Sequence, residues 1–484
     1  QSALAVHPVG TSGTGWSYDN NSKTLTLTEG TFDFSSTVPV QCAIKLGQSA
    51  AIAGGIFNGA VTNDNHGNIS GGTFNGTVSN SNGGLIFGGN FKEDVTNNAT
   101  TTNSTFATII DGTFDKKVIN NAGGEIVGGT FRTVENNTNG TIYNGKFTGT
   151  VTNKGTIKNG TFAANKKVTN YSTIEKGTFN GTVENYGTIN KGSFNGTVTN
   201  EGANATIKNG TFEQEVINNA GGKITDGTFN GTVTNNANGK IDGGTFAANK
   251  EVENWGIITG NGTFEGSVTN YSDIEKGTFK GEVKNHNGTI SGGKFEGTVI
   301  NDVNGTISDG TFNKKVSNIN GNISNGTFNE TVTNEDGGTI YGGTFAGGVN
   351  NKNDRIYGGV FNGNATLTNV TGLHSITVAS GAKIKEVNDV SAVGESAVWN
   401  PYVVVTESNK TKEVTITAST DIFSLNGRLL GEGDHVNGNK NTVKFTMPGG
   451  PVVLNGAITC TDLVMEGGWP KDSKKGQISC SGTD

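Results

Sequence analysis

The chain repeats one short arrangement of apolar and polar positions. In nearly every repeat an isoleucine is followed five residues later by a phenylalanine, and usually four residues after that by a valine. A glycine stands two positions before the phenylalanine and an asparagine two positions after the valine. The apolar-x-Asn element occurs nineteen times in succession, from Val61-x-Asn63 to Leu367-x-Asn369, at a spacing of roughly 17 residues. A fixed short period sustained this long predicts a solenoid.

The residues of each repeat favour strands. Phe, Val, Ile and Thr are good strand formers, and the alternation in Thr-Val-Thr-Asn places valine and asparagine on the same side of a strand. A helix is excluded because glycine and asparagine recur too often and no stripe of period 3.6 is present. Each repeat is therefore expected to form three short extended segments joined by corners. The glycine at the first corner fits a backbone with positive φ or a close approach.

Stacking such repeats places like residues on like residues. Isoleucine, phenylalanine and valine columns then fill the interior, and neighbouring turns pair at about 4.8 Å. We predict an all-β fold, a parallel β-helix of about nineteen turns and on the order of 90 Å long, and right-handed because that hand is commoner. The predicted domains are an N-terminal cap (1–47), the repeat domain (48–370) and a C-terminal β-rich module (371–484).

The repeated asparagine is predicted to point into the interior or into a corner. A carboxamide both donates and accepts, so stacked asparagines can bond to one another and to backbone groups of the corner. Aspartate could only accept, and a column of charges would repel. We expect an architectural column that includes Asn80, Asn153, Asn185, Asn200, Asn235, Asn270 and Asn334.

Both ends of the repeat domain need caps, because a stack exposes apolar interior and unpaired strands at its ends. Residues 16–32 are expected to form a hairpin that leads into an irregular first turn, in which Val40-x-Cys42 replaces Val-x-Asn. In the C-terminal module, segments such as 443–447 are expected to form antiparallel strands. Cys460 and Cys480 are candidates for a disulfide that staples this end, or all three cysteines are unpaired.

Composition and charge exclude some classes of function. The net charge is −7 with only three arginines, so no basic stripe favours nucleic-acid binding. No apolar run approaches the length of a transmembrane segment. Because the chain starts at Gln1 and not at Met, either a signal peptide has been removed or the chain has been shortened.

Three segments resemble a known family. The opening Gly15-Trp-Ser-Tyr-Asp19, the stretch Gly71-Gly-Thr-Phe-Asn-Gly-Thr-Val78 and Phe445-Thr-Met-Pro448 are similar to segments of secreted, cell-surface β-helix proteins of Gram-positive gut-type bacteria. The resemblance implies an adhesive or structural role at the cell surface. A Leu-Pro-x-Thr-Gly anchor of the sortase type is missing from the chain, which argues against covalent attachment to a cell wall.

Catalytic chemistry is not indicated. Polysaccharide-cleaving β-helices need paired carboxylates, or a calcium cluster with a basic residue, in a cleft, whereas these repeats are nearly uniform. No His/Cys spacing suggests a metal site, and no cofactor is expected. The charges that follow the phenylalanines are expected to pair between turns, in the sets Lys92, Asp115 and Arg132, and Glu265, Lys280 and Glu296.

The best candidate for a binding site is a row of rings. In several tight turns the residue after the column asparagine is aromatic or a histidine: Tyr171, Tyr186, Trp255, Tyr271 and His286. Consecutive turns would align these rings along one edge, where flat rings can stack on sugar faces. The alternative, to which we give more weight, is that they cover the corner and shield the backbone.

The sequence therefore predicts an extracellular, non-catalytic rod that acts as an adhesin, stalk or fibre component. Its expected partners are host or microbial glycans or surface proteins, or further copies that associate end to end or laterally. One alternative is a self-assembling filament subunit, since the ends of a stack can pair with another copy. A second alternative is a glycan-binding or glycan-cleaving β-helix.

Overall fold

The fold is a parallel β-solenoid. The structure, a computed structural model, describes residues 12–35, 38–99, 105–352 and 354–361, and the backbone of short strands between 367 and 480. All regular elements among these residues are β-strands, and they form about 19 turns, ~17 residues apart. The predicted all-β solenoid is confirmed, while its right hand remains a prediction.

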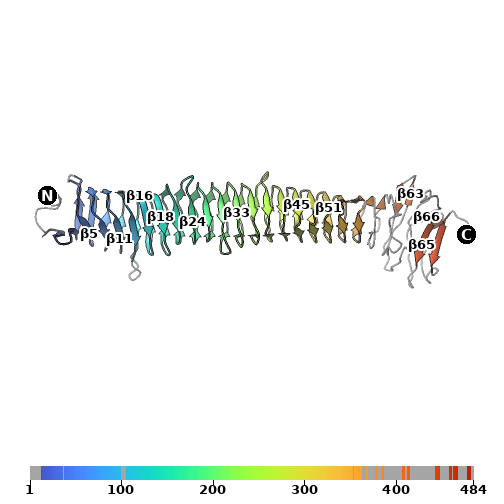
Figure 1. Ribbon diagram of the computed structural model, residues 1–484, viewed down its shortest axis with the longest axis horizontal. Coiled ribbons are helices and arrows are strands. Elements are labelled where there is room, and N and C mark those ends of the chain that lie inside the picture. Colours follow the sequence, from blue (N-terminus) through green and yellow to red (C-terminus); the bar gives the residue numbers. More distant parts are fainter. Residues whose placement is uncertain are drawn as a thin grey trace. The chain divides into compact units, whose positions relative to one another are not determined.

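Two compact units make up the chain, residues 1–245 and 246–484. In each unit the strands of one turn pair with the equivalent strands of the next, as Figure 1 shows. Every turn contributes to three ladders, which carry the isoleucines, the phenylalanines and the Val-x-Asn elements.

The strands of residues 1–245 follow this plan. The isoleucine strands are β4 (Gly30–Asp33), β6 (Ala50–Gly54), β9 (Asn68–Ile69), β12 (Leu85–Ile86), β15 (Ala107–Ile109), β17 (Gly124–Ile126), β19 (Thr141–Ile142), β22 (Thr156–Ile157), β25 (Thr173–Ile174), β28 (Thr188–Ile189), β31 (Thr206–Ile207), β34 (Lys223–Ile224) and β37 (Lys240–Ile241). The phenylalanine strands are β7 (Ile56–Phe57), β10 (Thr73–Phe74), β13 (Asn90–Phe91), β20 (Lys146–Phe147), β23 (Thr161–Phe162), β26 (Thr178–Phe179), β29 (Ser193–Phe194), β32 (Thr211–Phe212) and β35 (Thr228–Phe229). The Val-x-Asn strands are β8 (Val61–Asn63), β11 (Val78–Ser81), β14 (Val95–Asn98), β21 (Val151–Asn153), β24 (Val168–Asn170), β27 (Val183–Asn185), β30 (Val198–Asn200), β33 (Val216–Asn218) and β36 (Val233–Asn235). Two longer strands, β16 (Thr113–Asn120) and β18 (Thr130–Asn136), each belong to both the phenylalanine ladder and the Val-x-Asn ladder.

The second unit repeats the pattern, and β38 (Thr245–Phe246) spans the division. Its isoleucine strands are β40 (Ile257–Ile258), β43 (Asp273–Ile274), β46 (Thr289–Ile290), β49 (Thr306–Ile307), β52 (Asn322–Ile323), β55 (Thr339–Ile340) and β58 (Arg355–Ile356). Its phenylalanine ladder contains β41 (Thr263–Phe264), β44 (Thr278–Phe279), β47 (Lys294–Phe295), β50 (Thr311–Phe312), β53 (Thr327–Phe328), β56 (Thr344–Phe345), β59 (Val360–Phe361) and β61 (Thr377–Val378). Its Val-x-Asn ladder contains β39 (Val252–Asn254), β42 (Val268–Asn270), β45 (Val283–His286), β48 (Val299–Asp302), β51 (Val316–Ile319), β54 (Val332–Glu335), β57 (Val349–Asn351) and β60 (Leu367–Thr368).

The register places identical residues directly above one another. Phe179 pairs with Phe194, and the two buried rings stack at 4.8 Å with 6° between their planes. Val183 pairs with Val198 in the neighbouring ladder. The core is therefore thin, and each turn adds one buried side chain of each kind, which explains how a chain with only 32% hydrophobic residues forms a continuous interior.

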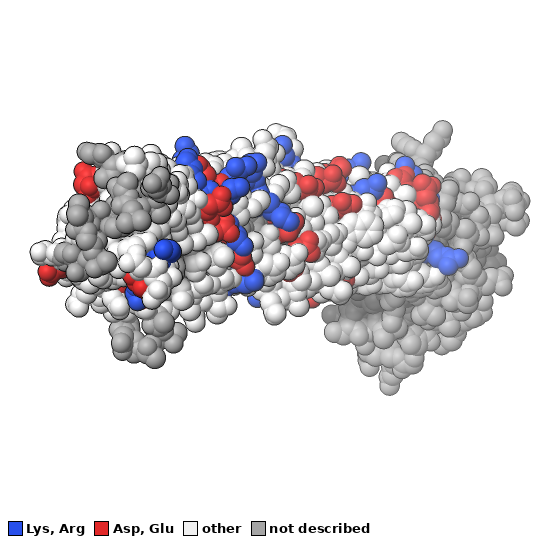
Figure 2. Space-filling model, turned by 60° about the vertical axis from the view of Figure 1, so that its left-hand side comes forward, with Lys and Arg blue, Asp and Glu red and all other residues white. Residues whose placement is uncertain are grey.

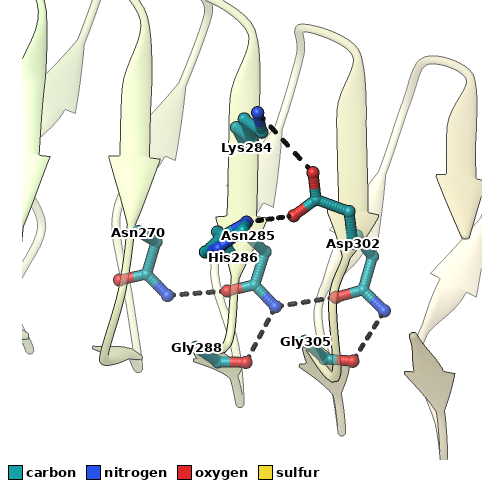
Figure 3. A network of polar contacts seen from close by, with 8 residues as sticks. Asn270, Lys284, Asn285, His286, Gly288, Asp302 and Gly305 are labelled. Atoms are coloured by element: carbon teal, nitrogen blue, oxygen red, sulfur yellow. Dashed lines mark hydrogen bonds and ion pairs between the residues drawn. The ribbon is translucent and has the colours of Figure 1, made fainter. Parts of the chain in front are cut away.

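The asparagine column is confirmed as a buried hydrogen-bonded ladder. All seven asparagines named from the sequence have no exposed surface. The Nδ2 of Asn185 donates to Oδ1 of Asn200 at 2.7 Å and to the carbonyl of Gly187 at 2.9 Å. Each side chain thus links its turn to the next and also closes its own corner. The same pattern joins Asn270 to Asn285 in the second unit (Figure 3).

The N-terminal turns are built differently. The predicted hairpin is present: β2 (Trp16–Asp19) pairs antiparallel with β3 (Thr24–Leu27), and β1 (Ser12–Gly13) pairs with β2. Strand β3 also pairs in parallel with β5 (Ala43–Leu46), and β5 pairs in parallel with β8.

The placement of Val40-x-Cys42 in the Val-x-Asn column is wrong. Val40 forms a bridge to Phe57 and so lies in the phenylalanine column, whereas Leu46 pairs with Asn63. An asparagine at 46 would face Leu27 in the turn below, which cannot bond to it. Cys42 is a free, half-buried thiol, and burial raises its pKa.

The strands beyond residue 378 are only partly antiparallel. β62 (Ile384–Lys385), β63 (Thr406–Ser408) and β64 (Thr411–Val414) form an antiparallel sheet. However, β65 (Thr442–Thr446) pairs in parallel with β67 (Asp462–Glu466), which corrects the antiparallel prediction for 443–447. β66 (Ala457–Cys460) and β68 (Gln477–Cys480) are also parallel, and their register places Cys460 opposite Cys480. The disulfide remains a prediction.

Candidate functional site

The predicted row of rings forms two separate groups. Tyr171 and Tyr186 belong to the first unit, and Trp255, Tyr271 and His286 belong to the second. Each of them directly follows a column asparagine. The backbone N–H of the residue at this position bonds to the asparagine carbonyl of the turn below, as Tyr186 does to Asn170 at 2.7 Å. The ladder therefore fixes the place of each ring.

Within each group the rings stack on one another. Tyr171 and Tyr186 have ring centroids 5.0 Å apart and 14° between their planes, and Trp255 and Tyr271 are 3.9 Å apart at 11°. His286 meets Tyr271 edge-on at 5.6 Å and 73°. At such short separations near-parallel rings overlap as a stack, commonly with an offset. Although Tyr171 is 50% and Trp255 46% exposed, the inner faces of each stack are already occupied.

This geometry changes what the rings can do. A sugar that packs on an aromatic side chain needs an open ring face, and a stack offers solvent its edges and its terminal faces only. The rings therefore contact one another, and both the covering role and the glycan-facing role remain predictions. Burial and the nearby carboxylates of Glu184 and Glu201 raise the pKa of Tyr186.

The second group ends in a charged network, shown in Figure 3. Nδ1 of His286 lies 2.9 Å from Oδ1 of Asp302 in the next turn, and Nζ of Lys284 lies 3.6 Å from the other carboxylate oxygen. His286 thus contacts an aromatic ring on one side and a carboxylate on the other. All three side chains come from outward positions of β45 and β48, directly beside the buried asparagines.

The predicted pairing of charges between turns is correct for most of the residues named. Lys92 pairs with Asp115 at 2.5 Å and Lys280 with Glu265 at 2.7 Å. Glu296 instead contacts Lys294, two residues before it, at 2.5 Å. Figure 2 shows the resulting surface, on which acidic and basic side chains lie next to one another in a band that crosses the turns. Exposed pairs of this kind contribute little stability, so their main effect is to avoid like charges on neighbouring turns.

Sequence reasoning missed two further features of the surface. Tyr341 and Tyr357, which each follow an isoleucine, stack at 5.3 Å in the second unit. In the first unit two hollows lie along the corner that carries the positive-φ glycines, with volumes of about 700 Å³ and 330 Å³. The sequence signal for the hollows is the type of residue that precedes each corner glycine. This signal can be recognised only when the repeats are aligned, because the alignment shows which of these residues lie on neighbouring turns.

Two searches concern only the part of the chain that the structure describes. In it no group of three or more His, Cys, Asp or Glu side chains is arranged to hold a metal ion. It also contains no helix that could span a membrane. Comparison with models of protein families, with curated proteins and with solved structures found no match for this chain.

Proposed function

We propose that this protein is an extracellular structural or adhesive element that works through a stiff, repeated scaffold and not through catalysis. The observation that carries the proposal is that residues of each column bind the same residues in the next turn. Phenylalanine stacks on phenylalanine, asparagine bonds to asparagine, and many outward charges pair with charges one turn away. A scaffold of this kind can space or display whatever it carries.

The N-terminal end bears on the choice between single particles and filaments. There the antiparallel hairpin of β2 and β3 lies over the Val-x-Asn ladder, with Trp16 and Tyr18 buried opposite Leu27 and Leu25. The hairpin therefore protects the edge of this ladder, while β4 in the isoleucine ladder pairs only with β6 among the described strands. This arrangement supports a discrete element over a subunit that stacks end to end.

Electron microscopy of the purified protein in negative stain tests the proposal. We expect discrete elongated particles of uniform length. Long fibres would favour the filament alternative, and compact round particles would contradict both.

Glycan binding by the ring groups is a second candidate, supported by the exposure of Tyr171 and Trp255. The terminal faces of the stacks are the surfaces on which a sugar could pack. The test compares the wild-type protein with the Trp255→Ala/Tyr271→Ala variant on a glycan array. Binding that is lost in the variant supports a glycan-facing edge, and unchanged binding removes it.

A further inference from the structure

The smaller hollow of the first unit carries an unusual set of side chains. It has a volume of about 330 Å³, and its lining includes Lys176, Lys191, Thr178, Ser193 and Thr211. These residues come from three consecutive turns, because Thr178 pairs with Ser193 and Ser193 with Thr211. Equivalent residues are therefore about 4.8 Å apart along the stack.

Glycines at the corner between the isoleucine and phenylalanine strands line the hollow. Gly177 and Gly192 form its floor with φ of 149° and 146°. A Cβ on Gly177 would lie 3.0 Å from the ring of Phe179, so a side chain there would crowd the core and strain the backbone. The floor is fixed by the packing of the core below it.

Two different walls border this floor. One is formed by the residues that precede the corner glycines, which in four successive turns are Asn159, Lys176, Lys191 and Asn209. The other is formed by the hydroxyl residues that precede the phenylalanines. Both sets of residues line the same hollow and carry hydrogen-bond donors, and the hydroxyl groups can also accept.

The hollow is lined by two lysines and by no acidic residue. Lys176 and Lys191 are exposed and form no ion pair with any described residue, whereas Lys167 on a neighbouring face pairs with Glu184 at 3.1 Å. None of the residues that line the hollow is acidic, and Glu175, next to Lys176 in the chain, is not among them. Like charges on adjacent turns repel, and here the protein offers no internal partner.

We propose that this hollow binds a linear polysaccharide that carries carboxylate or sulfate groups, running along the stack across the turns of Lys176 and Lys191. The two ammonium groups would bind successive acidic groups, and the hydroxyl and carboxamide walls would exchange hydrogen bonds with sugar hydroxyls. A phosphate polymer would satisfy the lysines but would leave the wall of hydroxyl residues unused. The site does not depend on whether the protein acts as a spacer, so the microscopy test and the binding test can fail separately.

The chain supplies its own control. Residues 271–279 nearly copy residues 171–179, and Lys276 occupies the position of Lys176 before the corner glycine Gly277. In the next turn, however, Gly292 stands where the first unit has Lys191. Lys276 is thus a matched lysine without a second lysine before the next corner glycine, and the lysine that does lie in that turn, Lys294, pairs with Glu296 at 2.5 Å. The Lys276→Gln variant controls for the loss of one surface charge.

Binding would be measured by biolayer interferometry at low salt, with immobilised polygalacturonate, dextran sulfate, uncharged dextran and polyphosphate. We expect the full-length protein to bind at least one of the two acidic polysaccharides and not dextran, and to bind more weakly as salt is added. The Lys176→Gln/Lys191→Gln variant should bind about tenfold more weakly or worse. The Lys276→Gln variant should match the wild type.

A second variant tests the sugar wall. Thr178→Val/Ser193→Ala keeps both charges and removes two hydroxyls, so it should weaken polysaccharide binding severalfold. Equal binding by the Lys176→Gln/Lys191→Gln variant, no binding to either acidic polysaccharide, or binding to polyphosphate alone would each overturn the proposal. Circular dichroism melting curves confirm that each variant is folded; all these substitutions are at the surface, and we expect unchanged midpoints.

Discussion

The middle turns and the N-terminal turns occupy the same three ladders with different residues. In the middle, Phe179 lies between two parallel rings, at 4.4 Å from Phe162 and 4.8 Å from Phe194. At the N-terminal end, Phe34 meets Phe57 edge-on, with 84° between the rings. The asparagine column likewise gives way to Leu46 and, below it, to Leu27.

The difference shows what the repetition does and where it must stop. A column of identical residues satisfies every member except the first and the last. Asn63 is the first asparagine, and its buried Oδ1 has no hydrogen-bond partner, since Leu46 below it cannot donate. The N-terminal end instead has apolar side chains, an edge-on ring and an antiparallel hairpin. These groups do not need hydrogen bonds or stacking partners from a further turn.

Removing a stacked ring should have the largest effect. Phe179→Ala leaves a cavity between two rings and is expected to cost about 3–5 kcal/mol. Phe34→Ala removes a buried ring that lies 6.4 Å from Phe32 and meets Phe57 edge-on, so it loses less face-to-face contact and its cost should be smaller. Urea unfolding followed by hydrogen exchange in the affected turns measures both. Equal losses would show that the middle and end rings are equivalent.

Breaking the asparagine ladder should come next. Asn185→Leu leaves the Nδ2 donor of Asn170 and the Oδ1 acceptor of Asn200 without their partner in the column. The expected cost is about 1–3 kcal/mol for each buried group. Asn63→Leu leaves the Oδ1 acceptor of Asn80 without its partner but affects no donor of a neighbouring asparagine. It also removes the Oδ1 of Asn63, which has no hydrogen-bond partner. The end variant should therefore lose much less stability in the same urea experiment. A larger loss at Asn63 than at Asn185 would contradict the ladder.

The corner glycines provide a third contrast. Gly227 has φ of 137°, and a Cβ there would lie 3.1 Å from the ring of Phe229; Gly30 has φ of 90° with nothing within 4 Å of a Cβ. Gly30→Ala should cost about 1–2 kcal/mol from backbone strain alone. Gly227→Ala should cost more because the core must also shift. Thermal unfolding midpoints of the two variants rank them, and the reverse order would count against a floor fixed by the core.

Two aspartates near the ends of the described turns should respond to pH with opposite sign. Hydrogen bonds from Ser35 lower the pKa of Asp33, so the stability it gives is present above the ordinary aspartate pKa and is lost as pH falls through the lowered value. Burial raises the pKa of Asp354, so its contribution is present below the ordinary pKa and is lost as pH rises through the raised value.

At neutral pH, Asp33→Asn should therefore lower the thermal midpoint slightly and Asp354→Asn should raise it slightly. Both differences should shrink in acid, where each wild-type carboxyl is protonated. Melting curves between pH 2 and pH 7 check the signs. A shift of the same sign for both variants would show that these carboxyls do not differ as their contacts indicate.

Much of the fold could be predicted because the repeated residues show which positions of successive turns pair with one another. Once valine and asparagine are assigned to one side of a strand, the buried column that contains Asn185 follows from alternation and stacking. The ends could not be predicted in this way, because Val40 and Leu46 occur once and no repetition shows which column they join. Parallel pairing of β65 with β67 was missed for the same reason.

The surface was predictable in position but not in geometry. The sequence placed Tyr171 and Tyr186 on consecutive turns, but whether their faces are open depends on side-chain rotamers that a spacing does not contain. The hollow at Lys176 and Lys191 required the register first, since the two lysines are far apart in the chain and become neighbours only when turns are aligned.

The most direct test of in-register stacking uses spin labels on outward positions of neighbouring turns. In a protein whose three native cysteines are replaced by serine, labels at Thr62 and Ser79, which pair between β8 and β11, would lie about 4.8 Å apart along the stack. A second pair, Thr62 and Thr96, lies two turns apart. Strong spin exchange in the first pair, with only weaker dipolar broadening in the second, is the predicted result. Narrow, independent spectra from the first pair would contradict the stacked columns on which the account rests.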